Sequence, residues 1–472
     1  MKTYCLLMAT CFAGLLSLQA QDITGSWNGL LDIQGTQLRL VMHISETNGT
    51  YHTTLDSPDQ GATDIPTDKT TFVDGQLQVE ALALAMVFTG QLQEDGSIEG
   101  TFAQGGFELP LVLGREEIEK PLAEVRPQDP TDFPYQQETV SFENIKVEAV
   151  TLAGTLTLPE GELPKAIVVL VSGSGPQDRN EEIGPFNHRP FLVLSDYLTR
   201  QGIGVLRYDD RGVAESTGDH GSATTADFAS DASAAIDYLA GREDLAGVQL
   251  GIAGHSEGGM IAPMVARENE EVDFIALLAG PGTPIDELML EQSRLISEAS
   301  GVPEEVARLN RQFLGEAYAY LKAEKEQPTE EVRNGVIRIL RDGIEEFPED
   351  MKADLGDLDE FASSEAEGLL TPWFRYFITF QPATVLKEVQ CPVLAINGSL
   401  DLQVPAKANL EAIENALQAG GNTNFEIFEM PGLNHLFQQA TTGAVAEYGE
   451  IEETFNLAAM ERIATWIHTQ SE

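Results

Sequence analysis

The sequence contains few basic residues for its length. Lys and Arg together number 28 among 472 residues, whereas Asp and Glu number 76, and the formal net charge is −48. A chain this acidic repels phosphate backbones and anionic lipid surfaces, so we expect neither nucleic acid nor a membrane surface as a partner. Because 42% of the residues are hydrophobic and 22% are charged, the composition is that of a globular protein, and the length favours two to four domains.

Cysteine is also scarce, and two of the three cysteines lie near the N-terminus, at Cys5 and Cys11. The segment that holds them begins with Lys2, continues as a short apolar run and ends with the small residue Ala20, which is the pattern of a secretory signal peptide. We therefore expect residues 1–20 to be removed and the protein to be exported, to the periplasm or outside the cell. Cys391 would then remain alone, which excludes an intrachain disulfide. We expect no membrane span, since no later apolar run is long enough.

Residues 21–115 have the pattern of a small all-β domain. Apolar side chains alternate with polar ones over Leu38–Ile44, as in a half-buried strand. Hairpin turn signals separate the apolar runs, at Asn48-Gly49, Asp74-Gly75 and Asp95-Gly96. This spacing predicts a small antiparallel barrel or sandwich, and the proline-rich residues 116–138 are predicted to be a linker.

The rest of the chain alternates strand-like and helix-like segments. Continuous apolar runs such as Ala166–Val171 are typical of strands that are buried on both faces of a parallel sheet. We therefore predict an α/β core in two parts, residues 139–282 and 384–472. The intervening residues 283–383 show helical, charge-rich patterns and no strand, which indicates a helical insertion that covers the site as a cap.

Gly254-His255-Ser256-Glu257-Gly258-Gly259 carries the strongest chemical signal. It matches G-x-S-x-G and lies between a predicted strand and a predicted helix, the setting in which a serine is held as a nucleophile on a tight turn. Small residues must flank such a turn, and Gly254 and Gly258 do so. The helix N-terminus that follows favours the negative charge that develops in the reaction.

A serine nucleophile needs a base, and the base needs a carboxylate to orient it. Of the seven histidines, His435 lies in a loop directly after the predicted strand Phe425–Glu429, where open α/β sheets place their ligands. His255 is too close to Ser256 in sequence to turn back onto its hydroxyl group. Asp401 follows the buried strand Pro392–Asn397, and the order serine, aspartate, histidine is that of an α/β-hydrolase triad.

The tetrahedral intermediate needs an oxyanion hole. We expect the backbone N–H of Glu257 to be one donor and the loop that follows Val171 to supply the other. Ser174 is the preferred donor in that loop and Gly175 the second choice. Gly175, Asp178 and Arg179 are candidate substrate contacts. Asp178 and Arg179 alternatively brace the loop by an ion pair, and we favour bracing for these two. No spacing of His, Cys, Asp or Glu indicates a metal site, and the chemistry needs no cofactor.

With these motifs in place, residues 140–472 resemble the α/β-hydrolase superfamily. The sequences Ser-Gly-Ser-Gly-Pro-Gln-Asp-Arg-Asn-Glu (172–181), Gly-His-Ser-Glu-Gly-Gly, Asn-Gly-Ser-Leu-Asp and Pro-Gly-Leu-Asn-His are similar to those of secreted bacterial carboxylesterases related to the serine-aminopeptidase-like hydrolases. One departure is Ser172-Gly173, where the family usually has His-Gly, and a backbone donor is compatible with that change.

The resemblance implies a serine hydrolase that cleaves small-molecule carboxylic esters of short to medium acyl chains. A serine peptidase of the aminopeptidase type is the alternative, since Glu257 or the acidic insertion could hold a substrate amine. A non-catalytic ligand-binding protein, in which the β domain captures the ligand, is a minor third possibility. The natural acyl and alcohol groups, the role of the β domain and the oligomeric state are not evident from the sequence.

Overall fold

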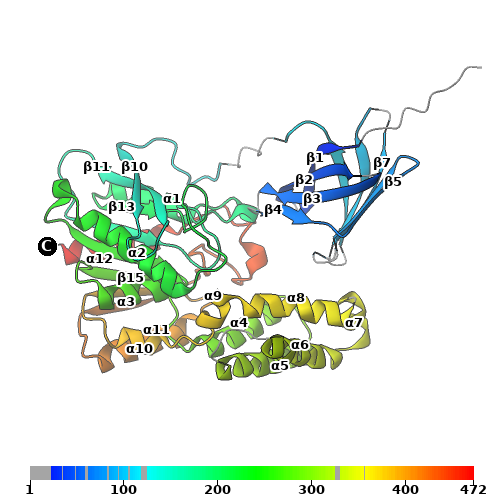
Figure 1. The fold of residues 1–472 in the computed structure, drawn as a ribbon. Coiled ribbons are helices and arrows are strands. Elements are labelled where there is room, and N and C mark those ends of the chain that lie inside the picture. The colour runs from blue at the N-terminus through cyan, green and yellow to red at the C-terminus, as the bar shows by residue number, and fades with distance from the viewer. Residues whose placement is uncertain are drawn as a thin grey trace, which may run out of the picture. The chain divides into compact units, whose positions relative to one another are not determined.

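The computed structural model describes residues 23–471, apart from short segments at 34–35, 48, 59–61, 82–83, 85, 94, 105–106, 119–124, 325–329 and 356. The expected signal peptide therefore lies outside the described residues. The chain divides into two compact units, Met1–Pro121 and Leu122–Glu472. Figure 1 draws the N-terminal unit in blue to cyan and the C-terminal unit in cyan to red.

The N-terminal unit is all-β. Its nine strands form one antiparallel sheet in the order β4-β3-β2-β1-β9-β8-β7-β6-β5. The strands are β1 (Gly25–Ile33), β2 (Thr36–Thr47), β3 (Thr50–Ser57), β4 (Ala62–Pro66), β5 (Lys69–Val73), β6 (Gln76–Ala81), β7 (Met86–Leu92), β8 (Ile98–Gln104) and β9 (Phe107–Gly114). Strand β3 also packs against β5, so the sheet curves as in a barrel. The alternation over Leu38–Ile44 buries Leu40, Met42 and Ile44 inside it.

The C-terminal unit is built on an eight-stranded sheet in the order β10-β11-β13-β12-β14-β15-β16-β17. Strand β11 is antiparallel to both of its neighbours, and the strands from β13 to β17 are parallel to one another. The strands are β10 (Tyr135–Glu143), β11 (Thr151–Pro159), β12 (Ala166–Val171), β13 (Gly204–Tyr208), β14 (Gln249–His255), β15 (Phe274–Leu278), β16 (Val393–Gly398) and β17 (Phe425–Met430).

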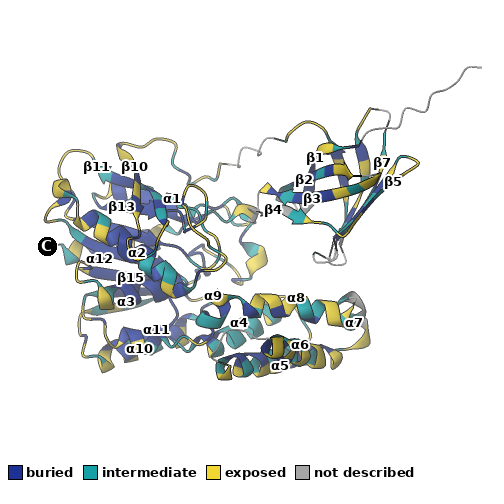
Figure 2. Cartoon of the chain, in the orientation of Figure 1, coloured by how far each residue is buried: buried dark blue, intermediate teal, exposed yellow. Residues whose placement is uncertain are grey.

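Helices cover both faces of this sheet. Those that alternate with the strands are α1 (Pro190–Arg200), α2 (Thr225–Ala240), α3 (Gly258–Glu268), α10 (Pro382–Leu386), α11 (Ala406–Ala419) and α12 (Leu457–Gln470). The sequence of strand β12 is continuously apolar because both of its faces are buried. Ile167 and Val169 pack with α2 and α3, whereas Val168 and Leu170 pack with α1 and α12. The central strands β12–β16 and the inner faces of these helices are accordingly buried in Figure 2.

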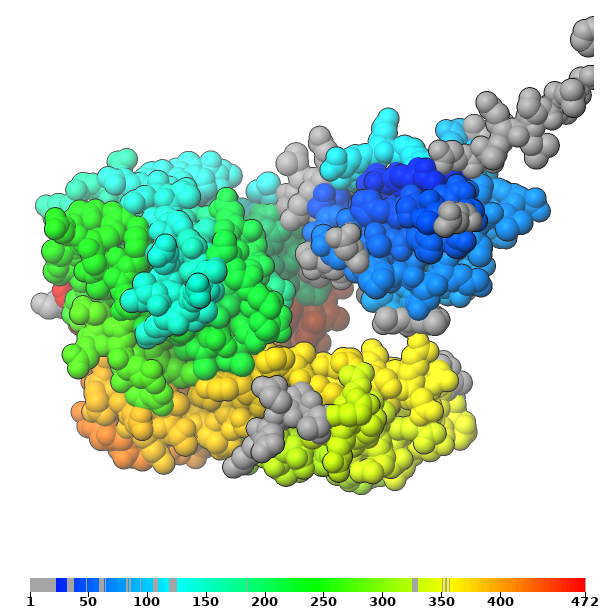
Figure 3. Space-filling view, viewed as in Figure 1, coloured from blue at the N-terminus to red at the C-terminus, as the bar shows by residue number. Residues whose placement is uncertain are grey.

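A helical segment, α4–α9, separates β15 from β16. It comprises α4 (Ile285–Ala299), α5 (Glu304–Ala323), α6 (Glu330–Glu345), α7 (Glu349–Leu355), α8 (Leu358–Leu370) and α9 (Pro372–Phe377). It has its own hydrophobic core, and the described residues of 283–383 contain no strand. In the space-filling view, its yellow-green and yellow residues form a continuous layer along one side of the α/β unit (Figure 3).

Two boundaries differ from those read from the sequence. Strand β10 begins at Tyr135, inside the stretch expected to be a linker, because it pairs with β11 over its whole length. Arg126 and Gln128, in the same stretch, donate hydrogen bonds to backbone carbonyls of the α/β unit, among them those of Phe186 and Phe455. Among the described residues, the structure contains no helix that is both long and apolar enough to cross a membrane.

Candidate active site

Ser256 lies on the tight turn between β14 and α3. Its φ angle is +52°, a left-handed conformation that costs free energy in a non-glycine residue and is typical of functional turns. The turn is possible because the flanking residues lack side chains: a Cβ at Gly254 would lie 2.0 Å from the Gly258 carbonyl oxygen, and one at Gly258 would lie 2.1 Å from that of Val171. The Ser256 N–H donates to the Leu278 carbonyl oxygen at 2.9 Å, which ties the turn to β15.

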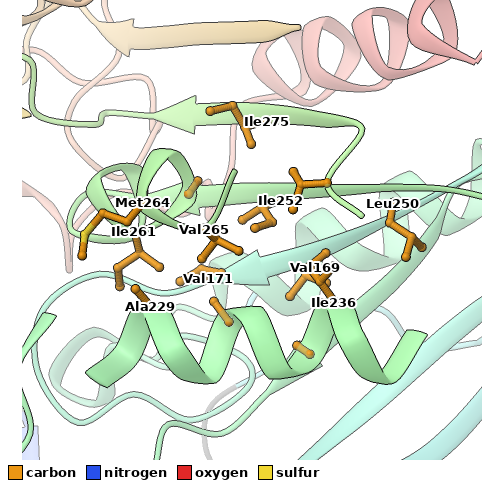
Figure 4. Packing of buried hydrophobic residues seen from close by; sticks show 14 of the residues in the cluster. Val169, Val171, Ala229, Ile236, Leu250, Ile252, Ile261, Met264, Val265 and Ile275 are labelled. Atoms are coloured by element: carbon orange, nitrogen blue, oxygen red, sulfur yellow. The ribbon is translucent and has the colours of Figure 1, made fainter. Parts of the chain in front are cut away.

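The strand and the helix on either side of the turn contribute to one apolar core. Figure 4 shows Val169 and Ile252 of the sheet packed with Ile236 of α2 and with Ile261 and Val265 of α3. Packing of this density resists displacement, so it holds the start of α3 rigidly against the ends of β12 and β14. Rigid support of this kind keeps a nucleophile in one position.

Asp401 and His435 are in direct contact. The Asp401 Oδ2 atom accepts a hydrogen bond from His435 Nδ1 at 2.8 Å, and both residues are buried. The other oxygen of Asp401 accepts the backbone N–H groups of Gln403 and Val404, each at 2.8 Å. The carboxylate is therefore held in its own loop, after β16, and it contacts the Nδ1 atom of an imidazole from the loop after β17.

A neighbouring residue connects the serine turn to the histidine loop. His255, which precedes Ser256, contacts the His435 carbonyl oxygen through Nε2 at 3.0 Å, and the two rings are 4.9 Å apart between centroids. All three predicted triad residues lie at or just beyond the carboxyl ends of parallel strands, β14, β16 and β17. These ends meet at one edge of the sheet, which is where such folds bind ligands.

The loop after β12 approaches the same edge. A Cβ at Gly173 would lie 3.3 Å from Ser256 Cβ, so this loop passes directly beside the serine. Asp210 braces the loop by accepting hydrogen bonds from Ser172 Oγ and from the Gln177 N–H. Burial raises the pKa of Asp210 well above its ordinary value, although both of these donors oppose the effect.

Gly173 itself does not offer a free donor, because its N–H points to the Glu181 carboxylate at 2.8 Å. Ser174 is exposed, and its hydroxyl group interacts with the carboxylate of Glu257. The backbone N–H groups of Ser174 and Glu257 therefore stay predictions as oxyanion donors. Ser174 lies in the loop after β12, which passes beside the serine turn, and Glu257 directly follows Ser256.

Glu257 has a second feature that its sequence position did not reveal. Its side chain is buried, and its carboxylate accepts hydrogen bonds from Thr225 Oγ1 at 2.6 Å and from Trp373 Nε1 at 2.9 Å and 3.1 Å. Burial raises the pKa of Glu257, and the hydrogen bonds from Thr225, Trp373 and Ser174 oppose the increase. Helix α9 is thereby joined to the residue that follows Ser256.

Two of the three proposed substrate residues, Arg179 and Asp178, have intramolecular partners. Arg179 forms ion pairs with Asp209 and Glu215, each at 2.5 Å, and Asp178 Oδ1 accepts the backbone N–H groups of Asn180 and Glu182. Both contacts favour bracing, the role that the sequence analysis put first. Gly175 has a φ angle of +98°, which glycine adopts without strain, so it too shapes the loop.

The sequence did not predict a role at the site for three residues: His255, which cannot reach the serine hydroxyl group, Glu181, which ends one of the motifs, and Trp373, which lies in the helical insertion. Their partners are distant in sequence. The one sequence feature that indicates a role at the site is that Glu181 and His255 lie within the motifs themselves. Among the described residues, no group of three His, Cys, Asp or Glu side chains is arranged to hold a metal ion.

Parts of the chain are similar to known proteins. Residues 162–335 match the sequence model of a family described as serine aminopeptidase, S33. The chain is also 29% identical, over 305 residues, to esterase EstD of Thermotoga maritima. The match covers 65% of this chain and 62% of EstD, so the chain spans less than two thirds of that relative.

Solved structures similar to this chain include two esterases and a dienelactone hydrolase. The Pyrococcus furiosus esterase Pf2001 is 14% identical, with a TM-score of 0.43 and coverage of 75% of this chain and 99% of the esterase. Est1E of Butyrivibrio proteoclasticus with bound ferulic acid is 14% identical, with a TM-score of 0.41 and coverage of 70% and 98%. A dienelactone hydrolase of Anabaena variabilis is 17% identical, with a TM-score of 0.38 and coverage of 71% and 98%.

Proposed function

We propose that this protein is an exported serine hydrolase that cleaves carboxylic esters of short to medium acyl chains. The observation that carries the proposal is the buried contact of 2.8 Å between Asp401 and His435, at the sheet edge where Ser256 is held in a left-handed turn. The similarity to an esterase supports the substrate class. The signal-like pattern of residues 1–20 supports export.

The reaction follows from the roles of these residues. His435 Nε2 takes the proton of Ser256 Oγ as that oxygen attacks the ester carbonyl carbon, and Asp401 stabilises the imidazolium that forms. The tetrahedral intermediate collapses, the bond to the alcohol oxygen breaks, and His435 returns the proton to the leaving alcohol. Water then attacks the acyl-enzyme with the same base, which releases the acid and restores Ser256.

The oxyanion of each tetrahedral intermediate is stabilised by backbone N–H groups. Those of Glu257 and Ser174 are the proposed donors, and removing one such donor typically costs about 10²–10³ in turnover. The N-terminus of α3 adds a favourable potential for negative charge at the same place. No step requires a metal ion or an organic cofactor.

We further propose that α4–α9 is a cap over the acyl site. Its α4 and α9 residues Leu288 and Phe377 form an apolar cluster with Met260 of α3 and Val404, which follows Asp401. Apolar side chains from both sides of the expected site suit the hydrocarbon part of an ester. The number of carbons accepted is the quantity to be measured.

Aminopeptidase activity is the second candidate, because the matched family is described by that name. Such an enzyme needs a free carboxylate for the substrate α-amine. Glu257 is a poor choice, since its carboxylate already binds Thr225 and Trp373 and is buried. The exposed acidic side chains of the helical segment are the remaining candidates for that carboxylate, so aminopeptidase activity is tested as well.

The test is hydrolysis of p-nitrophenyl esters, from acetate to dodecanoate, by the purified chain. Aminoacyl-p-nitroanilides are assayed in parallel, and Ser256→Ala is compared with Ser364→Ala, a matched change on the exposed side of α8. We expect ester turnover that disappears only in Ser256→Ala. Anilide cleavage would favour the peptidase, and silence on both panels would contradict the proposed catalytic function and revive ligand binding. Fractionation of expressing cells tests export.

A further inference from the structure

His255 and Glu181 form a second histidine–carboxylate contact beside the first one. Glu181 Oε1 lies 2.8 Å from His255 Nδ1, and both side chains are buried. On its other side, His255 Nε2 lies 3.0 Å from the His435 carbonyl oxygen. The proposed triad uses neither residue, although the His255 ring lies beside that of the proposed base.

The partners of His255 determine how many protons its ring carries. A backbone carbonyl oxygen can only accept a hydrogen bond. Glu181 Oε1 also accepts the Gly173 N–H at 2.8 Å, and an ionised carboxylate can only accept hydrogen bonds. Both ring nitrogens must therefore donate, and a ring that donates from both nitrogens is an imidazolium.

The electrostatic surroundings agree with a charged ring. Burial by itself lowers the pKa of His255, but the negative charge and hydrogen bond of Glu181 outweigh it and raise the pKa above its ordinary value. The His435 carbonyl and, more weakly, the charge of Asp401 act in the same direction.

This contact also links three loops of the site. A continuous series of hydrogen bonds runs from the Gly173 N–H, beside Ser256, through the Glu181 carboxylate and the His255 ring to the backbone of His435. The loop after β12, the turn after β14 and the loop after β17 are thus joined by two side chains. Their carbonyl and N–H partners are main-chain groups, so a shift of either side chain moves the loops themselves.

The arrangement is costly, which argues that more than packing maintains it. Glu181 has a φ angle of +52°, a strained conformation for a residue with a side chain. Its Oε2 atom is buried and accepts no hydrogen bond from the described residues. A buried ion pair is often no more stabilising than apolar side chains of the same volume, and strained conformations cluster at functional sites.

We propose that Glu181 and His255 form a buried carboxylate–imidazolium pair that positions the base His435 and the loop after β12 relative to Ser256. They are positioning residues, since neither reaches the hydroxyl group. The inference rests on the proposed serine hydrolase function and adds to it. It predicts that the two charges act on His435 in opposite senses, because a positive neighbour disfavours protonation of the base and a negative neighbour favours it.

The first measurement is the protonation of His255 in the unmodified chain. Histidine is labelled with ¹⁵N, and the His255 signals are assigned by their absence from His255→Gln. We expect both ring nitrogens to carry protons at pH 8, where an ordinary histidine is neutral. A neutral His255 ring at that pH would overturn the inference, and this readout needs neither a substrate nor a stable Glu181 variant.

The second measurement is the pH dependence of Ser256 labelling by a fluorophosphonate. In this reaction Ser256 Oγ bonds to phosphorus, fluoride leaves and His435 takes the hydroxyl proton, so the rate reports the base without a known substrate. Glu181→Gln keeps an acceptor oxygen but removes the negative charge, and His255→Gln removes the positive one. The acid limb is the part of the pH–rate profile in which the rate falls as the pH is lowered. We expect it to lie at higher pH in His255→Gln than in Glu181→Gln.

Asp231→Asn is the matched control. Asp231 forms another well-buried ion pair of the unit, with Arg211 at 2.6 Å, and its removal should lower stability without moving the acid limb. At the optimal pH, we expect the labelling rate of both Glu181→Gln and His255→Gln to fall about 10²-fold, as for other displacements of about 1 Å within a site. Acid limbs that move together or stay still in these two variants would show that the pair only stabilises the fold.

The outcomes separate this inference from the proposed function. A wild-type chain that is labelled at Ser256 but hydrolyses no ester would contradict the esterase and leave the pair intact. Ester turnover together with a neutral His255 ring would overturn the pair and leave the esterase. If neither variant folds, the protonation of His255 in the unmodified chain decides.

Discussion

Trp373 of helix α9 donates its indole N–H to the carboxylate of Glu257, the residue directly after Ser256, at 2.9 Å and 3.1 Å. The two residues are 116 positions apart in sequence. The bond joins the helical segment α4–α9 to the turn that holds the proposed nucleophile. Thr225, at the start of α2, donates to the same carboxylate at 2.6 Å. A helix of the α/β core and a helix of the segment α4–α9 therefore both bind the side chain of Glu257.

Trp373→Phe should loosen this junction. Phenylalanine keeps an aromatic ring but lacks the indole N–H, so the buried carboxylate of Glu257 loses a donor. Hydrogen bonds to charged groups are worth about 1.5–3 kcal/mol. We expect a lower free energy of unfolding and a fall in kcat, measured by urea titration and ester hydrolysis. Trp466→Phe, a buried tryptophan on the opposite face of the sheet, is the matched control, and equal effects on kcat in both variants would contradict the role of the indole N–H.

Glu257→Gln should change how stability depends on pH. Because burial raises the pKa of Glu257 in the folded state, the native structure favours the neutral carboxyl group. Its contribution is fully present below the unfolded pKa and is lost as the pH rises through the folded pKa. Glutamine stays neutral, so the variant should gain stability relative to wild type from pH 5 to pH 8 in urea unfolding. A difference that stays constant or reverses would show that Glu257 does not titrate as described.

Asp401→Asn should nearly abolish turnover without unfolding the chain. The oxygen that accepts the Gln403 and Val404 N–H groups is retained, so the loop should keep its shape. The amide presents N–H groups to His435 Nδ1 and forces the wrong tautomer, which costs about 10⁴ in kcat in enzymes of this mechanism. Ester hydrolysis measures the loss of turnover, and circular dichroism measures whether the chain stays folded. A loss of turnover below tenfold would point to another acid.

Gly258→Ala should disrupt the serine turn. A methyl group there would lie 2.1 Å from the Val171 carbonyl oxygen, so the loop after β12 must move or the turn must open. We expect a large loss of both stability and activity, measured by thermal unfolding and fluorophosphonate labelling. Gly368→Ala is the control: this residue lies within α8, with no atom within 4 Å of a new Cβ, and the change should stabilise the helix by up to about 1 kcal/mol.

Much of the fold was predictable because local patterns agree with the tertiary structure. The apolar run Ala166–Val171 has no polar face, and the structure buries its two faces in different cores. Alternation over Leu38–Ile44 predicted a half-buried strand for the same kind of reason. Boundaries were harder: β10 begins at Tyr135 within a proline-rich stretch, since pairing with β11 outweighs the local turn signals.

In the candidate site, too, some features were predictable from the sequence and others were not. Gly254, Gly258 and the strand before them identify a strained turn from sequence alone, because only residues without side chains fit there. Chain order selected Asp401 and His435, and the structure brings these two into contact. The Glu181–His255 pair and the Trp373–Glu257 bond were not predictable, since each joins loops that the chain order does not relate.

The sequence by itself determined the acidic charge, the division into β and α/β regions and the position of Ser256 on a glycine-flanked turn. These properties depend on composition, on period and on steric rules that act within a few residues. The tertiary structure alone decided which carboxylates are buried beside the serine and which donors they accept, as Glu181 and Glu257 demonstrate. Such contacts depend on how separate strands and helices pack, and packing brings together residues that no local rule connects.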